Sequence, residues 1–248
     1  MLEPDEAHPV EVLNPESDSS LLLVADHAGR LIPRALGTLG LAEPDLSRHI
    51  AWDIGIRAVT EQVAAHFGAT AVMQRYSRLV IDCNRSPGVP SSIPAISEAT
   101  EIPGNRAVTA AEAQARQAAI FAPYHARIVQ ELDRREGKGR RCVLMAMHSF
   151  TPVFLGVARP WPVGLLHLQD TRFSDRLLAA LRGFAPGPVG DNEPYVATRE
   201  SDYALPVHGL DRGLLHAGVE IRQDLIAEPA GQAIWAAHMI RALTEAMA

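Results

Sequence analysis

A run of five apolar residues, Leu21 to Ala25, stops abruptly at the polar and small residues Asp26-His27-Ala28-Gly29. An unbroken aliphatic run of this length is typical of a strand buried on both faces, as in a parallel sheet covered by helices. His27 then lies at the carboxyl end of that strand, which is where α/β proteins bind ligands. The stretch predicts an α/β fold in which His27 faces a site, although a lone histidine is more often structural.

A second apolar run, Cys142 to Met147, also ends in a histidine, His148. Because neighbouring parallel strands lie about 5 Å apart, imidazoles at the ends of two such strands can reach a single metal ion. A third candidate strand, Leu215 to Ile221, holds Glu220 between apolar neighbours. A carboxylate buried there needs a partner, such as an arginine or a metal-bound water.

Apolar residues recur at helical spacing between Pro44 and Phe67, and Gly68 follows as a residue that can cap the end of a helix. A segment with poor helix formers interrupts this pattern. Asp53 and Gly55 lie inside this predicted helix, where both residue types are unfavourable. Such local inconsistency often marks a functional position. The alternative is that Asp53 lies on the solvated face of the helix or in a broken first turn.

Residues 69–74 and 79–83 predict two short strands or one long bent strand, and Arg78 and Arg85 flank the second part. The guanidinium forks of Arg78 and Arg85 are suited to bidentate binding of a carboxylate, although they can also pair with a structural acid such as Asp82. The loop that follows, residues 86–107, is long enough for a lid or a binding loop. Further helices are predicted over residues 109–137, with a kink at Pro123, and over 173–181 and 229–247.

The length and net charge of the chain limit the kinds of protein that it can be. The 248 residues fit one domain spanning 1–248, since no linker or repeat divides them. A formal net charge of −6 with scattered arginines disfavours nucleic acid and anionic membranes as partners. No signal peptide or run of about 20 apolar residues is present, so we expect a cytoplasmic protein. Cys83 and Cys142 lie in apolar runs and are expected to be reduced core thiols.

The polar residues at the predicted strand ends, together with Asp53, are a set typical of metallohydrolases. Catalytic zinc takes three protein ligands and keeps one position open for water, and a nearby carboxylate can act as general base. No HExxH, CxxC, P-loop or GxSxG motif points to another chemistry.

Several short motifs, in this order, resemble the N-formylglutamate amidohydrolases, which share the zinc carboxypeptidase fold. The resemblance runs from about Leu21 to Ile226 and includes Asp26-His27-Ala28-Gly29, Asp53-Ile54-Gly55, the stretch from Tyr76 to Arg85, Pro123-Tyr124-His125, Met147-His148-Ser149, Asn192-Glu193-Pro194-Tyr195 and the stretch from Glu220 to Asp224. It implies a three-layer α/β/α fold with a mostly parallel or mixed central sheet, of the zinc-dependent exopeptidase type.

The resemblance also implies roles for individual residues. His27 and His148 resemble the ligands of one zinc ion, Asn84 and Arg85 the carboxylate-binding pair, and Glu220 the catalytic glutamate. The carboxypeptidase pattern His-x-x-Glu fails at Arg30. The third ligand is therefore open between Asp53, which we favour, and Glu220.

The reaction that the resemblance implies is hydrolysis of an N-acyl amide, most simply N-formyl-L-glutamate to L-glutamate and formate, a step of histidine degradation. Glu220 is expected to act as general base on a metal-activated water, and Arg78, Asn84 and Arg85 to hold the carboxylates of a small substrate. One alternative is a zinc amidase or carboxypeptidase for another N-acyl amino acid or a short peptide. The other is a non-catalytic carboxylate-binding protein of the same fold.

Overall fold

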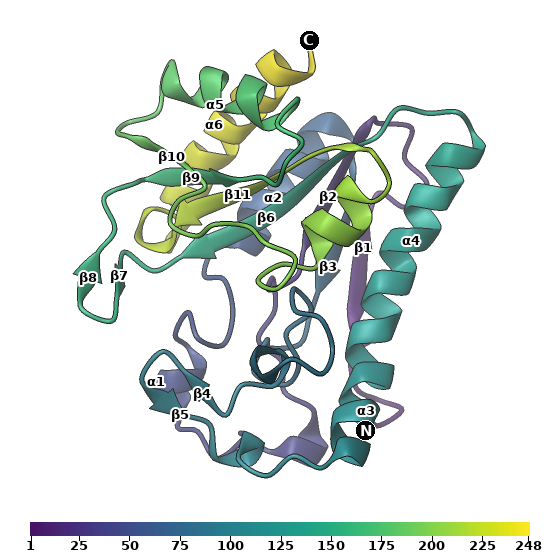
Figure 1. The fold of residues 1–248 in the computed structure, drawn as a ribbon, viewed down its shortest axis with the longest axis vertical. Helices are drawn as coiled ribbons and strands as arrows, with labels where there is room; N and C mark the ends of the chain where they lie inside the picture. The colour runs from purple at the N-terminus through teal and green to yellow at the C-terminus, as the bar shows by residue number, and fades with distance from the viewer.

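A seven-stranded sheet forms the centre of the molecule, which a computed structural model describes over residues 1–248 (Figure 1). The strand order is β1-β3-β2-β6-β11-β9-β10. These strands are β1 (Val10–Leu13), β2 (Leu21–Ala25), β3 (Thr70–Gln74), β6 (Val143–Phe150), β9 (Val163–Leu166), β10 (Val189–Asp191) and β11 (Leu215–Arg222).

The sheet is mixed. Strands β3, β2, β6 and β11 run parallel to one another, whereas β1 pairs antiparallel with β3 and β9 pairs antiparallel with β11. Two small hairpins lie outside it: β4 (Ile96–Ser97) with β5 (Thr100–Glu101), and β7 (Val153–Phe154) with β8 (Val157–Ala158). Both hairpins lie on the same side of the molecule (Figure 1).

The helices connect and cover these strands. They are α1 (Glu43–Leu46), α2 (Ile56–Phe67), α3 (Ala110–Arg116), α4 (Ala122–Gly137), α5 (Ser174–Arg182) and α6 (Pro229–Met247), with π-helical segments at Gln117–Phe121 and Ala204–Leu210 and 3₁₀ turns at Arg34–Leu36, Pro90–Ser92, Pro103–Asn105 and Gln223–Leu225. No helix has the length and hydropathy of a membrane-spanning segment.

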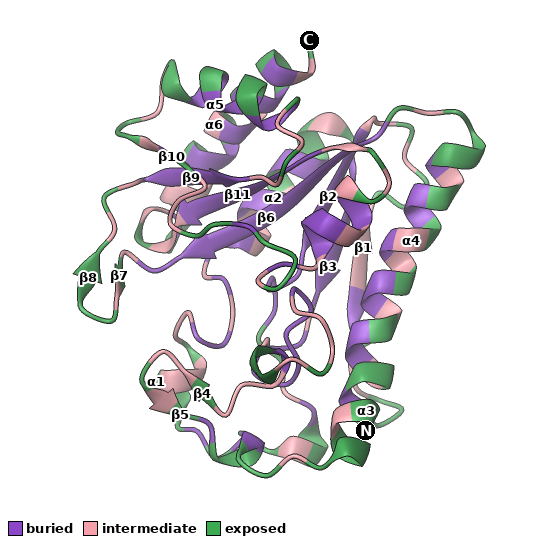
Figure 2. Cartoon of the chain, viewed as in Figure 1, coloured by how far each residue is buried: buried purple, intermediate pink, exposed green.

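Helices cover both faces of the sheet. Leu21 and Leu23 pack into a hydrophobic cluster with α2, α5 and α6, whereas Leu22 and Val24 pack into a second cluster with α4. Successive side chains of a strand point to opposite faces, so an unbroken apolar run is required when both faces are covered. Figure 2 shows the central strands buried along their length. This arrangement confirms the predicted three-layer α/β/α class with a mixed sheet.

The single helix predicted between Pro44 and Phe67 is wrong. The segment contains α1 and α2, separated by a loop that carries Asp53. Gly55 caps the start of α2 with a φ of 78°, and a Cβ atom there would lie 2.0 Å from the carbonyl oxygen of Ile226. The unfavourable residues in the helical pattern thus mark a break in the helix, which leaves Asp53 free to turn toward the sheet.

Other expectations need smaller corrections. The predicted strand over residues 79–83 is absent, and those buried residues form turns. The helix predicted over 109–137 begins with a Thr109 capping box and ends at Gly137, but a π-helical turn before Pro123 interrupts it. The loop over residues 86–107 contains the β4–β5 hairpin. The cysteines are free and buried, as predicted.

Candidate functional site

A cavity of about 390 Å³ opens beside the end of β2 and the last residues of β6 and β11. Its walls combine these strand residues with the loop before α2 and with both hairpins. The residues that line it are His27, His49, Ile50, Asp53, Arg78, Asp82, Asn84, Arg85, Ser91, Pro94, Ile96, Ser97, Glu98, His148, Ser149, Phe154, Leu166, Tyr195, Ser201, Asp202 and Glu220. The structure therefore places every sequence-predicted site residue around one cavity.

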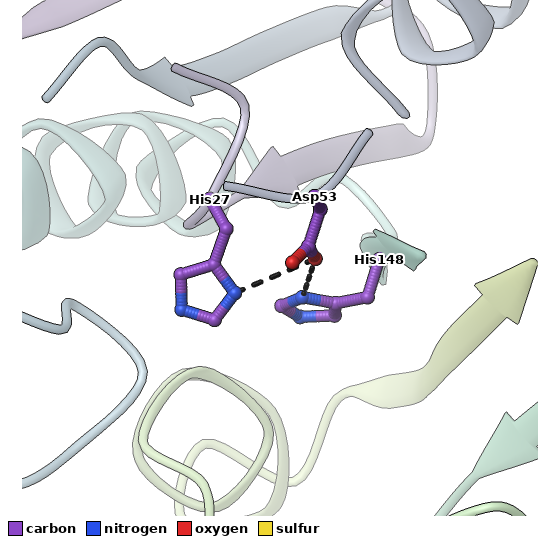
Figure 3. A group of neighbouring side chains, drawn as sticks. All are labelled: His27, Asp53 and His148. Atoms are coloured by element: carbon purple, nitrogen blue, oxygen red, sulfur yellow. Dashed lines mark hydrogen bonds and ion pairs between the residues drawn. The ribbon is translucent and has the colours of Figure 1, made fainter. Parts of the chain in front are cut away.

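Three of these side chains converge at its floor (Figure 3). One carboxylate oxygen of Asp53, Oδ2, lies 3.0 Å from Nδ1 of His148 and 3.4 Å from Nδ1 of His27. One ligand atom from each of the three residues lies within 4.8 Å of the other two. Asp53 is held in this position because its backbone N–H donates to the carbonyl of His27, and its Oδ2 accepts from the backbone N–H of Ser149.

The donor set and the local charge suit a divalent cation. The three residues are at most 4% exposed, and Nδ1 of His27 has no hydrogen-bond partner. Five carboxyl groups and two guanidinium groups line the cavity, so acidic side chains outnumber arginines around the point where a cation would lie. Two imidazoles and one carboxylate are a ligand set that zinc accepts at catalytic sites.

The electrostatics of the protein alone favour positive charge at the same point. Burial opposes ionisation of Asp53, but His27 and His148 outweigh it and hold the pKa of this carboxyl well below its usual value. Burial likewise opposes protonation of His148, yet Asp26 and Asp53 raise its pKa well above the usual value. A proton and a metal ion are thus attracted to the same atoms.

Each histidine has a second carboxylate behind its other ring nitrogen. Nε2 of His27 lies 2.7 Å from Oδ1 of Asp82, and Nε2 of His148 lies 3.4 Å from Oδ2 of Asp26. Metal-binding histidines commonly have such outer partners, which fix the ring and its tautomer. From the sequence, Asp82 is expected only as a structural partner of the arginines, and Asp26 only as part of a motif. The only sequence feature that could have identified them is their position beside the predicted strand ends.

Glu220 lies next to His148 in the register of β6 and β11. Its side chain is 6% exposed, lines the cavity, and has one oxygen, Oε2, without a hydrogen-bond partner. Burial raises the pKa of Glu220 to about 7, with the charges of Asp53 and Asp202 adding to the effect and His148 opposing it. A carboxyl group with this pKa can both accept and return a proton near neutral pH.

The predicted carboxylate-binding residues differ in how many of their polar groups are already paired within the protein. Arg78 donates from Nη2 and Nε to Asp82 at 2.8 and 3.1 Å and lies 3.5 Å from Asp53, so it is already paired with acids. Asn84 donates to Asp202 and accepts from two backbone N–H groups. Arg85 donates from Nη1 to the carbonyl oxygens of Asn84 and Ser201, and its Nη2 and Nε have no protein partner.

Two residues considered at the sequence level lie outside the cavity. Arg30 contacts Glu43 and Ser47 on the surface, so the position where the carboxypeptidase pattern fails takes no part in the site. His125 is buried in α4, where its Nε2 donates to the carbonyl of Cys83 and its Nδ1 lies 2.9 Å from Nε2 of His208. It supports the chain next to Asn84 and does not line the cavity.

Comparison with known proteins gives one family match. A sequence model described as N-formylglutamate amidohydrolase matches residues 19–227. A gene product from Agrobacterium tumefaciens of known crystal structure has 41% identity and a TM-score of 0.96, covering 99% of this chain and 97% of its own. An N-formylglutamate amidohydrolase from Ralstonia eutropha has 17% identity and a TM-score of 0.68, covering 97% and 98%, and shares the fold. No curated protein matches significantly.

Proposed function

The chain belongs to the N-formylglutamate amidohydrolase family, and from that premise we propose that it is a zinc-dependent hydrolase of a linear N-acyl amino acid amide, most simply N-formyl-L-glutamate. The observation that carries the proposal is the convergence of His27, Asp53 and His148 beside the buried carboxyl of Glu220. These three residues would hold one zinc ion. When bound, zinc polarises an acyl carbonyl and lowers the pKa of water.

Glu220 is the proposed proton carrier. It takes a proton from the attacking water, whose oxygen bonds to the formyl carbon. The C–N bond then breaks, and Glu220 returns the proton to the departing nitrogen, so that L-glutamate and formate leave. The pKa of about 7 that burial gives Glu220 suits both transfers. Because this carboxyl is already desolvated in the protein, little solvent must be displaced from it when substrate enters.

Arg85 is the proposed main contact for a substrate carboxylate. Two of its guanidinium nitrogens have no protein partner, whereas the guanidinium of Arg78 is held by Asp53 and Asp82. Arg78 therefore acts mainly through position: it fixes Asp82, which in turn fixes His27. Asn84 shapes the same wall, and its amide is already satisfied by Asp202 and the backbone of the next segment.

The test of this function is a metal and substrate assay. Protein stripped with a chelator is expected to lose turnover of N-formyl-L-glutamate and to regain it with one equivalent of Zn²⁺. Formate release is the readout, and a panel of other N-formyl and N-acetyl amino acids shows whether the site selects glutamate. Full turnover after complete metal removal would contradict the mechanism. Equal rates across the panel would contradict the assignment of N-formyl-L-glutamate as the substrate, but would leave the assignment to amide hydrolysis unchanged.

Arg85→Lys is expected to raise KM by about 10-fold with little change in kcat, since a single ammonium cannot replace a bidentate guanidinium fork. Steady-state kinetics with N-formyl-L-glutamate measure the effect. Arg30→Lys, which alters an exposed arginine outside the cavity, is the matched control. A lower kcat with unchanged KM would show that Arg85 acts on the reaction centre instead.

A further inference from the structure

Asp26 is a buried carboxylate for which the proposed reaction has no use. It is 1% exposed, neither of its oxygens has a hydrogen-bond partner, and it does not line the cavity. Leaving an ionised carboxylate in this state costs free energy. Its nearest charged partner is His148, whose Nε2 lies 3.4 Å from Oδ2 of Asp26.

The sheet places Asp26 beside His148. Val24 of β2 lies opposite Ala146 of β6, and His148 of β6 lies opposite Glu220 of β11. Two residues beyond the Val24–Ala146 pair, the same register brings Asp26 next to His148 on the same face of the sheet. The imidazole of His148 thus lies in a row between two carboxylates, with Glu220 at the cavity and Asp26 behind it.

The surroundings of Asp26 are closed to water. Tyr124 of α4 is fully buried and its hydroxyl lacks a partner. Burial raises the pKa of this phenol well above its usual value, and the negative charge of Asp26 adds to the effect. A carboxylate in this low-dielectric position interacts strongly with the imidazole of His148, 3.4 Å away.

We propose that Asp26 is a positioning residue for the metal site: its carboxylate, 3.4 Å from Nε2 of His148, keeps the ring proton on Nε2 by charge attraction and thereby presents the Nδ1 lone pair of that ring toward Asp53 and His27. A neutral imidazole has one donor and one acceptor nitrogen, so fixing the proton on Nε2 leaves Nδ1 as the metal-binding atom. Asp82 has the same relation to His27, at 2.7 Å. The inference rests on the proposed zinc-dependent function.

The experiment is Asp26→Asn, assayed by zinc affinity rather than by activity. Asparagine has the same shape, but its amide N–H can face Nε2 and stabilise the tautomer that carries its proton on Nδ1. The dissociation constant for Zn²⁺, measured by competition with a chromophoric chelator, is expected to rise by about 10–100-fold. The Tm of the metal-free variant is expected to fall, because Asp26 lies 3.4 Å from Nε2 of His148 and the substitution removes the counter-charge of that imidazole.

Glu131→Gln is the matched control, since Glu131 is also a carboxylate 1% exposed but pairs with Arg134 and Arg135 away from the cavity. It should lower the Tm without changing zinc affinity. Asp26→Ser, which also removes the carboxylate, gives the same test if the asparagine variant does not fold. If the Asp26 variants bind Zn²⁺ as tightly as the wild type, the role of Asp26 is overturned and the proposed function is not affected. A wild-type protein that binds no Zn²⁺ would overturn the proposed function and this inference with it.

Discussion

Replacing Glu220 with glutamine is expected to lower kcat for N-formyl-L-glutamate by about 10²–10⁴-fold, the range that general acid–base catalysis contributes. Glutamine keeps the size of the side chain and removes its capacity to take a proton. KM should change little, because Glu220 is not the residue that holds the substrate carboxylates in the proposed mechanism. Steady-state kinetics of the zinc-loaded variant measure both parameters.

The zinc content of the Glu220→Gln variant distinguishes its two proposed roles. If Glu220 is the proton carrier, the variant keeps a full equivalent of zinc while turnover falls. If Glu220 is instead the third metal ligand, zinc affinity falls together with turnover, and Asp53 loses that assignment. A variant with full zinc and a kcat within about 3-fold of wild type would remove Glu220 from the mechanism.

His148→Ala is expected to abolish both tight zinc binding and turnover. The substitution removes one of three proposed ligands and leaves Asp53 and Asp26 without the imidazole between them. The loss of zinc affinity should exceed the roughly 10–100-fold that removal of an outer hydrogen-bond partner costs. Metal analysis after gel filtration and competition with a chelator measure binding, and formate release measures turnover.

His66→Ala is the control for this prediction, because His66 lies on the exposed side of α2 and outside the cavity. It should bind zinc and turn over substrate as the wild type does. Full activity in metal-free His148→Ala protein would overturn the zinc mechanism. The Tm of the variant should fall, since loss of His148 leaves the buried carboxylates of Asp26 and Asp53 without the imidazole that faces both.

Much of the site could be predicted from strands that are buried on both faces. Leu21–Ala25 and the run before His148 have no polar alternation, and such strands occur where helices cover both sides of a parallel sheet. Their polar residues at one end must then lie at one edge of that sheet. His27, His148 and Glu220 do lie together at that edge, around one cavity.

Asp53 was harder to place. Its segment has helical periodicity on both sides, so pattern alone predicts one helix across it. The break is enforced by a tertiary contact: Gly55 adopts a left-handed conformation against the carbonyl of Ile226, which is 171 residues away along the chain and unknowable from local spacing. The sequence shows that Asp53 and Gly55 are unfavourable in a helix. It does not show in which direction the break turns the side chain of Asp53.

The partners of the charged groups depended on the same long-range packing. For Arg78 the sequence left two roles open, binding a substrate carboxylate and pairing with Asp82. The second is observed: Arg78 lies between Asp53 and Asp82, because residues 79–83 form no strand and Asp82 lies back toward Arg78. Asp26 was read only as part of a motif. Its proposed role comes from the β2–β6 register and from its 3.4 Å distance to His148.

By itself the sequence determined the layered α/β class, the edge of the sheet that carries polar chemistry, and the residue types available there, because hydrophobic periodicity and turn residues are local properties of the chain. The tertiary structure alone decided which of those groups converge on one point, which are paired with one another, and which carboxylate lies behind each histidine. Those outcomes depend on distances of 3 to 4 Å between segments that the chain brings together only on folding, and electrostatic interactions at such distances in a buried site outweigh any preference encoded in local sequence.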